Sequence, residues 1–280
     1  MRFLGLDPCR LINNSTRMKL RKGLFSFLSS AEHVLLGWPL LERMLIHALG
    51  AYYSSKFRRE WIYSETPPHF FDQNIGCFHF GFGGEATGAY PFFRGFYVAE
   101  IIRDGDYLLD VGCGDGFFTK RFYSPRCSCV DGVDVDADAI RVARRRNDSP
   151  NVRYHLLNAL TQPFPEAAYD VVVFDGAIGH FSAEDGRIVL AKIAAVLKPG
   201  GVFVGSESLG LEGGDHLQFF SSIDDLYDMF KPYFIHVEIR QQQYRIGRKG
   251  EILRQEAYWR CANDPQRLRN CHWIGGETAR

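Results

Sequence analysis

The stretch Leu108–Thr119, which reads LLDVGCGDGFFT, decides the fold of this chain. Apolar residues lead into Asp110, glycines follow at positions 112, 114 and 116, and the residues after them can begin a helix. This order predicts a buried parallel strand, a tight turn and a helix N-terminus, which together point backbone N–H groups at a ligand. Gly112 and Gly114 carry no Cβ, so a ligand can approach the backbone closely there.

The spacing of the glycines indicates which ligand the turn holds. A dinucleotide-binding loop reads G-x-G-x-x-G, whereas this chain has Phe117 at the sixth position and a glycine at position 116. The resulting pattern, D-x-G-x-G-x-G, resembles that of class I S-adenosylmethionine-dependent methyltransferases. The resemblance implies that the loop cradles the methionine part of that cofactor, with contacts from Asp110, Gly112, Cys113 and Gly114. We interpret Cys113 as a small residue that suits the turn, not as a nucleophile.

Composition limits the classes of partner. The 280 residues are 46% hydrophobic and 24% charged, which suits one domain with an extension or at most two domains. Lys and Arg number 33 and balance 33 Asp and Glu, so no global field attracts nucleic acid or a membrane. Seven scattered cysteines include only one C-x-C pair, Cys127 and Cys129, and favour free thiols in a reducing cytoplasm.

The N-terminal third is predicted to be a helical extension that caps the site. Basic residues precede Gly23–Leu28 as in a signal peptide, but polar residues interrupt the apolar run. We therefore expect a cytoplasmic protein without stable membrane insertion, with peripheral membrane contact as the alternative. Apolar residues recur at helical spacing over 41–52, and the aromatic segment Trp61–Tyr97 builds either a substrate pocket or a plain hydrophobic buttress.

Two further strand ends are predicted to hold the adenosyl group. The strand Cys129–Val133 ends at Asp134, about 20 residues past the glycine loop, where a carboxylate can bind both ribose hydroxyls, with Val135 beside it. Asp136 is predicted to be the N-cap of a helix over 137–146. The next strand, Val152–Leu157, ends at Asn158 and Ala159. In the resembled family an Asp commonly stands at position 158 and binds the adenine amino group, which an Asn can also do.

The almost continuously apolar run Tyr169–Phe174 predicts a central strand. It delivers Asp175 and Gly176 to the carboxyl end of the sheet, where ligands bind in open α/β folds. Lys198-Pro199-Gly200-Gly201 then ends a helix and precedes the strand 202–205, and 234–239 and 256–261 are predicted as the last two strands.

The resemblance covers about residues 101–261 and implies an α/β, Rossmann-like class I methyltransferase fold. It has a seven-stranded, mostly parallel sheet whose last strand is antiparallel, and an N-terminal helical and aromatic cap. We expect three regions, which are a cap over 1–100, the methyltransferase domain over 101–262 and a loose tail over 263–280.

Candidate catalytic residues follow the central strands. His180 is the first candidate for a base that removes a hydroxyl proton, and the alternative is that it packs or only binds substrate. His216 is the second candidate, or else an exposed loop histidine. Glu207 is expected to bind a substrate hydroxyl or amine, or to cap the next loop. A metal site is not expected, because metal-dependent catechol-type enzymes pair an Asp at the place of Asp175 with an Asp-Asn where this chain has Ser206-Glu207.

These observations favour a methyltransferase that uses S-adenosyl-L-methionine and acts on a small molecule. The favoured acceptor is a hydroxyl of a sugar, a glycan precursor or a secondary metabolite. Two alternatives remain open: an RNA methyltransferase, which the balanced charge disfavours, and a catalytically inactive binding protein of the same fold. The sequence leaves open whether the protein is a monomer or a homodimer.

Overall fold

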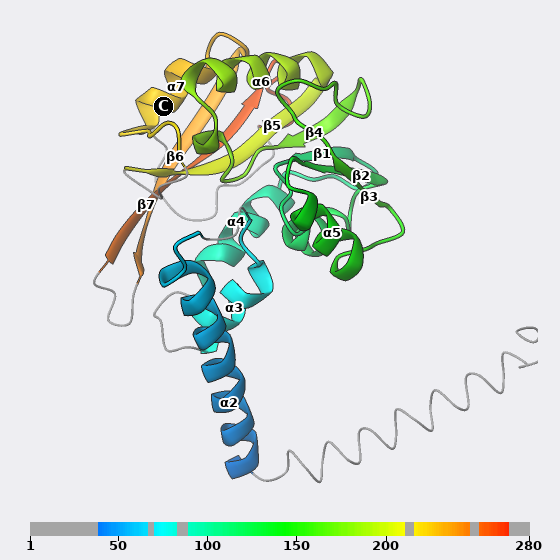
Figure 1. Cartoon of the computed structure of the whole chain (residues 1–280). Coiled ribbons are helices and arrows are strands. Elements are labelled where there is room, and N and C mark those ends of the chain that lie inside the picture. The colour runs from blue at the N-terminus through cyan, green and yellow to red at the C-terminus, as the bar shows by residue number, and fades with distance from the viewer. Residues whose placement is uncertain (1–38, 67–69, 83–88, 211–215, 247–251, 269–280) are drawn as a thin grey trace, which may run out of the picture. The chain divides into compact units, whose positions relative to one another are not determined.

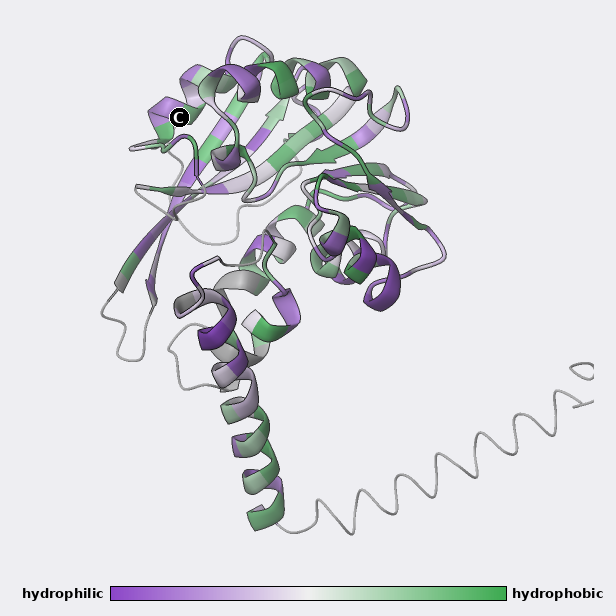
Figure 2. Ribbon diagram, in the orientation of Figure 1, coloured by the Kyte–Doolittle hydropathy of each residue, from purple (hydrophilic) through white to green (hydrophobic). Residues whose placement is uncertain are grey.

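The computed structural model describes residues 39–66, 70–82, 89–210, 216–246 and 252–268 (Figure 1). The expectations for the basic segment before Gly23–Leu28 and for the tail beyond residue 268 lie outside the described residues. The chain divides into two compact units, residues 1–52 and 53–280. In the first unit the described residues form the beginning of helix α2 (Pro39–Phe57), which confirms the helix predicted over 41–52. Figure 2 shows apolar residues along this part of α2.

The second unit is built on one mixed sheet. Its strands are β1 (Tyr107–Val111), β2 (Cys129–Asp134), β3 (Val152–Leu156), β4 (Tyr169–Val173), β5 (Leu197–Leu209), β6 (His236–Ile246) and β7 (Ile252–Ala262). The described residues give a seven-stranded sheet in the order β3-β2-β1-β4-β5-β7-β6, in which β7 runs antiparallel to both of its neighbours. The pairs from β3 to β5 are all parallel. The predicted fold class is therefore confirmed. The strand order reverses between β1 and β4, which places a ligand-binding crevice at their carboxyl ends.

Helices cover both faces of this sheet (Figure 1). On one face, α4 (Ala89–Ala99), the π-helix η3 (Thr119–Tyr123) and α5 (Ala137–Arg146) share a buried apolar cluster with the strands. On the other face, α6 (Ala183–Val196) and α7 (Ile223–Phe230) share a second cluster. The short helices η2 (Arg58–Ile62), α3 (Gln73–Phe82) and η4 (Ile178–His180) complete the described elements. The almost continuously apolar strand β4 lies between the two clusters, as its sequence predicts.

Local capping signals set the ends of the helices. Asp136 caps α5 by accepting hydrogen bonds from the amides of Asp138 and Ala139, as predicted. Ser222 and Asp225 form a reciprocal capping box at the start of α7. The chain after the glycine loop is helical, but Thr119–Tyr123 is wound as a π-helix. Such single π-turns are frequent near functional sites.

Three expectations about the last strands and the tail differ from the structure. β5 begins at Leu197, so the Lys198–Gly201 turn bulges within the strand and does not precede it, and Tyr169 and Val171 face Leu197 and Val202 across that bulge. β6 and β7 are longer than predicted because their polar halves pair with each other along the whole length. The tail is not loose at its start, since the Arg267 guanidinium is buried and bonds to the Asp106 carboxylate and the Ile101 carbonyl.

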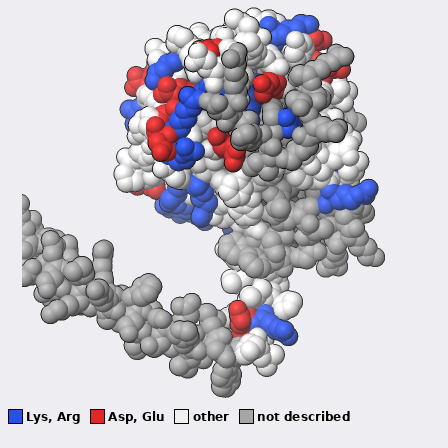
Figure 3. All heavy atoms as spheres, turned by 180° about the vertical axis from the view of Figure 1, so that it is seen from behind, with Lys and Arg blue, Asp and Glu red and all other residues white. Residues whose placement is uncertain are grey.

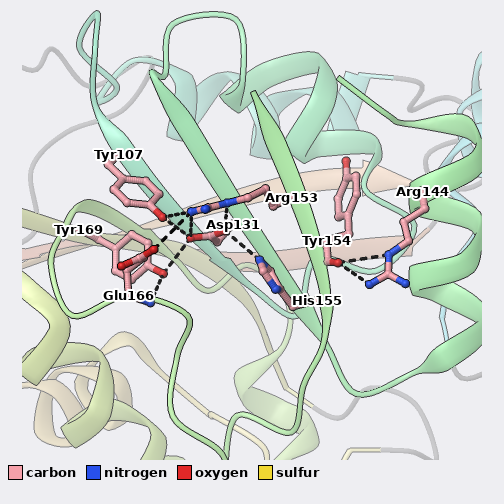
Figure 4. A network of polar contacts seen from close by, with 8 residues as sticks. All are labelled: Tyr107, Asp131, Arg144, Arg153, Tyr154, His155, Glu166 and Tyr169. Carbon is pink, nitrogen blue, oxygen red and sulfur yellow. Dashed lines mark hydrogen bonds and ion pairs between the residues drawn. The ribbon is translucent and has the colours of Figure 1, made fainter. Parts of the chain in front are cut away.

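A network of polar side chains surrounds Asp131 of β2 (Figure 4). The Asp131 side chain is fully buried and accepts hydrogen bonds from the Tyr107 and Tyr169 hydroxyls, the Arg153 guanidinium and the His155 Nε2 atom. Burial alone raises the pKa of this carboxyl, but these bonds outweigh it and lower its pKa below the usual range. Tyr107 and Tyr169 are the first residues of β1 and β4, so the network lies toward the amino ends of these two strands.

Candidate active site

The glycine loop lies across the end of β2. The amides of Gly112 and Cys113 both donate to the Val133 carbonyl, at 2.8 and 3.1 Å. Gly112 has a φ of +74°, and a Cβ there would stand 2.9 Å from the Ala177 Cβ in the turn after β4. A glycine is therefore needed for the β1 and β4 loops to approach each other. Gly114, with a φ of +53°, faces open space, since its Cβ would meet no atom of the described residues within 4 Å.

Asp134 is tied directly to this loop. Its Oδ2 accepts the Gly114 amide at 2.8 Å and its Oδ1 accepts the Asp136 amide at 2.9 Å. Burial raises the pKa of the Asp134 carboxyl, and the two amide bonds oppose this rise. The neighbouring Val135 is 67% exposed. The structure thus joins the predicted ribose-binding carboxylate to the predicted methionine loop.

Asp110 is the last residue but one of β1, beside the same loop, and is almost fully buried. Burial raises its pKa to about 7, and the nearby Asp175 and Asp134 carboxylates add to the rise. The Thr119 hydroxyl donates to Asp110 Oδ2 at 2.6 Å and opposes the rise. The Asp110, Asp134 and Asp175 carboxyls thus lie close enough to one another to raise the pKa of Asp110.

The start of α3 is bound to the far side of the loop. Asp115 accepts the Gln73 amide at 3.1 Å, and Arg146 of α5 pairs with Asp72 at 3.0 Å. Burial raises the pKa of Asp115 to about 6. These contacts connect a segment predicted to be part of the cap to the glycine loop.

The two residues predicted to contact the adenine, Asn158 and Ala159, make hydrogen bonds within the protein. The Asn158 side chain accepts a hydrogen bond from the Leu160 backbone amide through Oδ1 at 2.9 Å. The Asn158 backbone amide donates to the side-chain oxygen of Gln162. Ala159 is buried among apolar residues, and its carbonyl accepts from Lys192. The predicted adenine contact of these two residues stays a prediction.

Asp175 follows β4 and is held by a cation that the sequence analysis missed. Arg94 of α4 donates through Nε to both carboxylate oxygens at 3.1 Å, and its Nη2 lies 2.9 Å from Oδ2. The Ser206 hydroxyl also donates to Asp175. A Cβ on Gly176 would stand 2.2 Å from the Arg94 guanidinium, so the glycine makes room for it. Arg94 is a lone charge in the apolar sequence AYPFFRGFYVA, and that isolation is the signal that could have found it.

The two candidate catalytic histidines lie against each other. The rings of His180 and His216 stack with centroids 4.5 Å apart and planes inclined by 27°. The loop that carries His216 is anchored to η4, because the amides of Leu217 and Gln218 donate to the Gly179 carbonyl. Glu207 near the end of β5 lies beneath them, with Oε1 3.8 Å from His216 Nε2.

Two observations test whether this site suits S-adenosylmethionine. The backbone at Gly114 is open where a side chain would otherwise stand, and it adjoins the ribose-side carboxylate Asp134. The buried Asp110 and Asp134 carboxyls adjoin the loop, and a ligand there that carries a sulfonium and an ammonium group would favour their charged forms. The residues present therefore fit the cofactor. No group of three or more side chains suited to hold a metal ion is found among the described residues.

Comparisons with known proteins agree with this geometry. A family model described as a methyltransferase domain matches residues 108–201. An uncharacterised methyltransferase of Mycobacterium tuberculosis is 36% identical over 94 residues, which cover 34% of this chain and 46% of that protein. An O-methyltransferase of Penicillium expansum is 27% identical over 157 residues, covering 50% of this chain and 54% of that protein. The chain therefore spans about half the length of these two relatives.

Among solved structures, the N-methyltransferase NodS from Bradyrhizobium japonicum in complex with S-adenosyl-L-homocysteine has a TM-score of 0.49 and 16% identity, and covers 75% of this chain and 98% of its own. The family match includes the glycine loop, the strand that carries Asp134 and the strand that precedes Asp175. Over residues 108–201 the chain carries a methyltransferase domain, on the Rossmann-like fold of class I S-adenosylmethionine-dependent methyltransferases.

Proposed function

We propose that this protein transfers a methyl group from S-adenosyl-L-methionine to a hydroxyl of a small molecule, such as a sugar, a glycan precursor or a secondary metabolite. The observation that carries the proposal is the stacked pair His180–His216 beside the carboxyl ends of β4 and β5. An imidazole at this place can accept a hydroxyl proton near neutral pH. The similarity to an O-methyltransferase of Penicillium expansum supports an oxygen acceptor.

The residues of the chain divide the work. When bound, the cofactor supplies an electrophilic methyl group on a positively charged sulfur. Asp134 would bind the ribose hydroxyls, and the amides of the glycine loop and the Asp110 carboxylate would hold the methionine part. His180 would take the proton of the acceptor hydroxyl while the oxygen forms its bond to the methyl carbon and the carbon–sulfur bond breaks. Because the methyl group is already activated, positioning supplies most of the catalysis.

Surface charge supports a small acceptor over RNA. On the face that Figure 3 shows, Lys and Arg side chains lie interspersed with Asp and Glu over the described residues. Several arginines of α5 are already paired, as Arg141 is with Asp138 and Arg146 is with Asp72. RNA-binding surfaces instead gather positive charge on one face. For the part of the chain described, no helix is long and apolar enough to cross a membrane.

Titration calorimetry of the full chain with S-adenosyl-L-methionine and with NAD tests the cofactor. We expect binding of the first only, and Asp134→Ala should weaken it by about 1.5–3 kcal/mol through loss of charged hydrogen bonds. Unchanged affinity in this variant would refute the ribose assignment. Binding of S-adenosyl-L-methionine without turnover on nucleotide sugars, phenols or RNA would favour the inactive binding protein.

A further inference from the structure

Lys192 of α6 contacts the adenine-side loop, which is the segment 158–164 between β3 and β4. Its Nζ atom donates hydrogen bonds to the carbonyls of Ala159 and Gln162, the second at 2.5 Å. The same Nζ atom lies 5.1 Å from the centroid of the Phe164 ring. Phe164 is buried in the apolar cluster that α6 shares with the sheet. One ammonium group thus joins three points of the loop to the helix.

The surroundings of Lys192 are unusual for a lysine. Among the described residues its contacts are two carbonyls and an aromatic ring, with no carboxylate. Burial lowers the pKa of its ammonium group, and burial is the only cause of that shift. A lysine normally keeps its ammonium group in water. Here the loop carbonyls replace part of that water, so the side chain and the loop hold each other in place.

The loop also closes on itself through Asn158. The Asn158 carbonyl accepts the Thr161 and Gln162 amides at 3.2 and 2.9 Å, and its Oδ1 accepts the Leu160 amide. These bonds stay within five residues, so they shape the turn but attach it to no other element. The bonds from Lys192 span 33 and 30 positions and attach the turn to α6.

Ala159 is the residue at which this attachment matters most. It is buried, and its carbonyl is bonded to Lys192. No acceptor for its backbone amide is found in the part of the chain that the structure describes. Buried amides are normally paired, so this N–H is a donor that a ring nitrogen of a ligand can use. The direction of the donor depends on how the loop is held against α6.

We propose that Lys192 is a positioning residue that holds the adenine-side loop against α6, so that Asn158 and Ala159 face the adenine of the cofactor. The part that concerns the cofactor rests on the proposed function, whereas the attachment of the loop to α6 does not. Lys192 acts through the loop and does not touch the cofactor.

Hydrogen exchange of single amides in the full chain without cofactor tests the attachment. Lys192→Met keeps the length and the apolar stem of the side chain and removes the ammonium group. The Leu160 and Thr161 amides of the loop should then exchange at least about tenfold faster. The Val172 amide in the central strand β4 should exchange as before, which shows that the change is local. Unchanged loop amides in Lys192→Met would overturn the proposal.

Two further variants separate this role from a general effect of losing a lysine. Lys192→Arg again offers donors to both carbonyls and should restore most of the protection of the loop amides. Lys198→Met removes a lysine that bonds to Asp170 near the amino end of β4, at 2.8 Å, and is the matched control. It should leave the loop amides unchanged. Equal acceleration of the loop amides in Lys198→Met and Lys192→Met would contradict the proposal.

Titration calorimetry with S-adenosyl-L-homocysteine on the same variants tests the part that concerns the cofactor. Lys192→Met should bind about two- to tenfold more weakly, the range expected for one lost hydrogen bond, and Lys198→Met should bind like the wild type. Asn158→Ala and the double variant complete a double-mutant cycle. Because Lys192 acts through the loop that carries Asn158, the double variant should lose less than the product of the two single losses. A loss equal to that product would show independent roles and overturn the proposal.

The two measurements keep this proposal and the proposed function apart. A wild-type chain that does not bind S-adenosyl-L-homocysteine would overturn the proposed function, and the exchange rates would still decide whether Lys192 holds the loop. A wild-type chain that binds it, with faster loop exchange but unchanged affinity in Lys192→Met, would overturn the role of Lys192 alone.

Discussion

Asp131 and Glu207 are two buried carboxylates with similar chemistry and different surroundings. Each is almost fully buried, each has a pKa below the usual range, and each lies beside a histidine. Asp131 is bonded to four side chains from β1, β3 and β4, and His155 contacts it at 2.9 Å (Figure 4). Glu207 is bonded to two backbone amides, and its histidine stands farther away at 3.8 Å.

The difference teaches how burial alone fails to identify a functional carboxylate. The side-chain partners of Asp131 lie on β1, β3 and β4, so its charge serves to join strands. The histidine near Glu207 stacks on the ring of His180, the first candidate for the base, so this carboxylate lies next to the proposed site. A buried charge is a candidate for function when its partner in turn faces a site, and a candidate for stability when it does not.

The largest expected effect is on stability, at Asp131. Asp131→Ala leaves the Tyr107 and Tyr169 hydroxyls without their acceptor and should lower the free energy of unfolding by about 3 kcal/mol. Urea denaturation followed by circular dichroism measures the loss. Glu166→Gln, which removes a half-exposed carboxylate 3.7 Å from Arg153, is the control and should cost under about 1 kcal/mol. Equal losses in the two variants would contradict the role given to Asp131.

The fold follows from the sequence wherever the signals are local. The apolar runs, the glycine turn and the capping residues Asp136 and Ser222 each act within a few positions, so the element order and the sheet class were predictable. The bond from Arg267 to Asp106 joins residues 161 positions apart and leaves no local trace. The sequence of the polar outer halves of β6 and β7 predicts loops rather than strands, because these halves bury little apolar surface and are stabilised by pairing with each other.

The site was predictable in part for a geometric reason. Residues after parallel strands meet at one edge of a sheet, so Asp134, Asp175, His180 and the loop after β5 could be gathered from sequence. Their partners could not, because Arg94 comes from a helix before β1, and Thr119 reaches Asp110 only through the π-turn. Such contacts depend on how a helix is placed against the sheet, and the sequence pattern does not specify that placement.

A smaller effect of opposite sign is expected at Asp110, the buried carboxyl at the site end of β1. Asp131, with its lowered pKa, adds stability above the ordinary carboxyl value of about 4, and this is lost as the pH falls through its lowered pKa. Asp110 has its pKa raised to about 7, so folding favours its protonated form and stability is lost as the pH rises from about 4 through 7. Between pH 5 and 8 the loss should be about 2–3 kcal/mol.

Asp110→Asn tests this sign, because an Asn oxygen can still accept from Thr119 while no proton is lost. The variant should gain on the wild type by that amount between pH 5 and pH 8 in urea denaturation. Asp104→Asn, which changes an exposed carboxylate, should follow the wild type at every pH. A difference between Asp110→Asn and wild type that is the same at pH 5 and pH 8 would show that Asp110 is not protonated in the folded state.

The smallest expected effect compares the two histidines directly. His155→Gln removes one of four side-chain partners of Asp131 and should cost about 0.5–1.5 kcal/mol of unfolding free energy while leaving turnover unchanged. His216→Gln removes the ring stacked on the candidate base and should lower turnover while leaving the Asp131 contacts in place. Urea denaturation and activity assays on both variants give a two-by-two comparison. Lower turnover in His155→Gln, or unchanged turnover in His216→Gln, would contradict the distinction between a carboxylate that joins strands and one that lies next to the site.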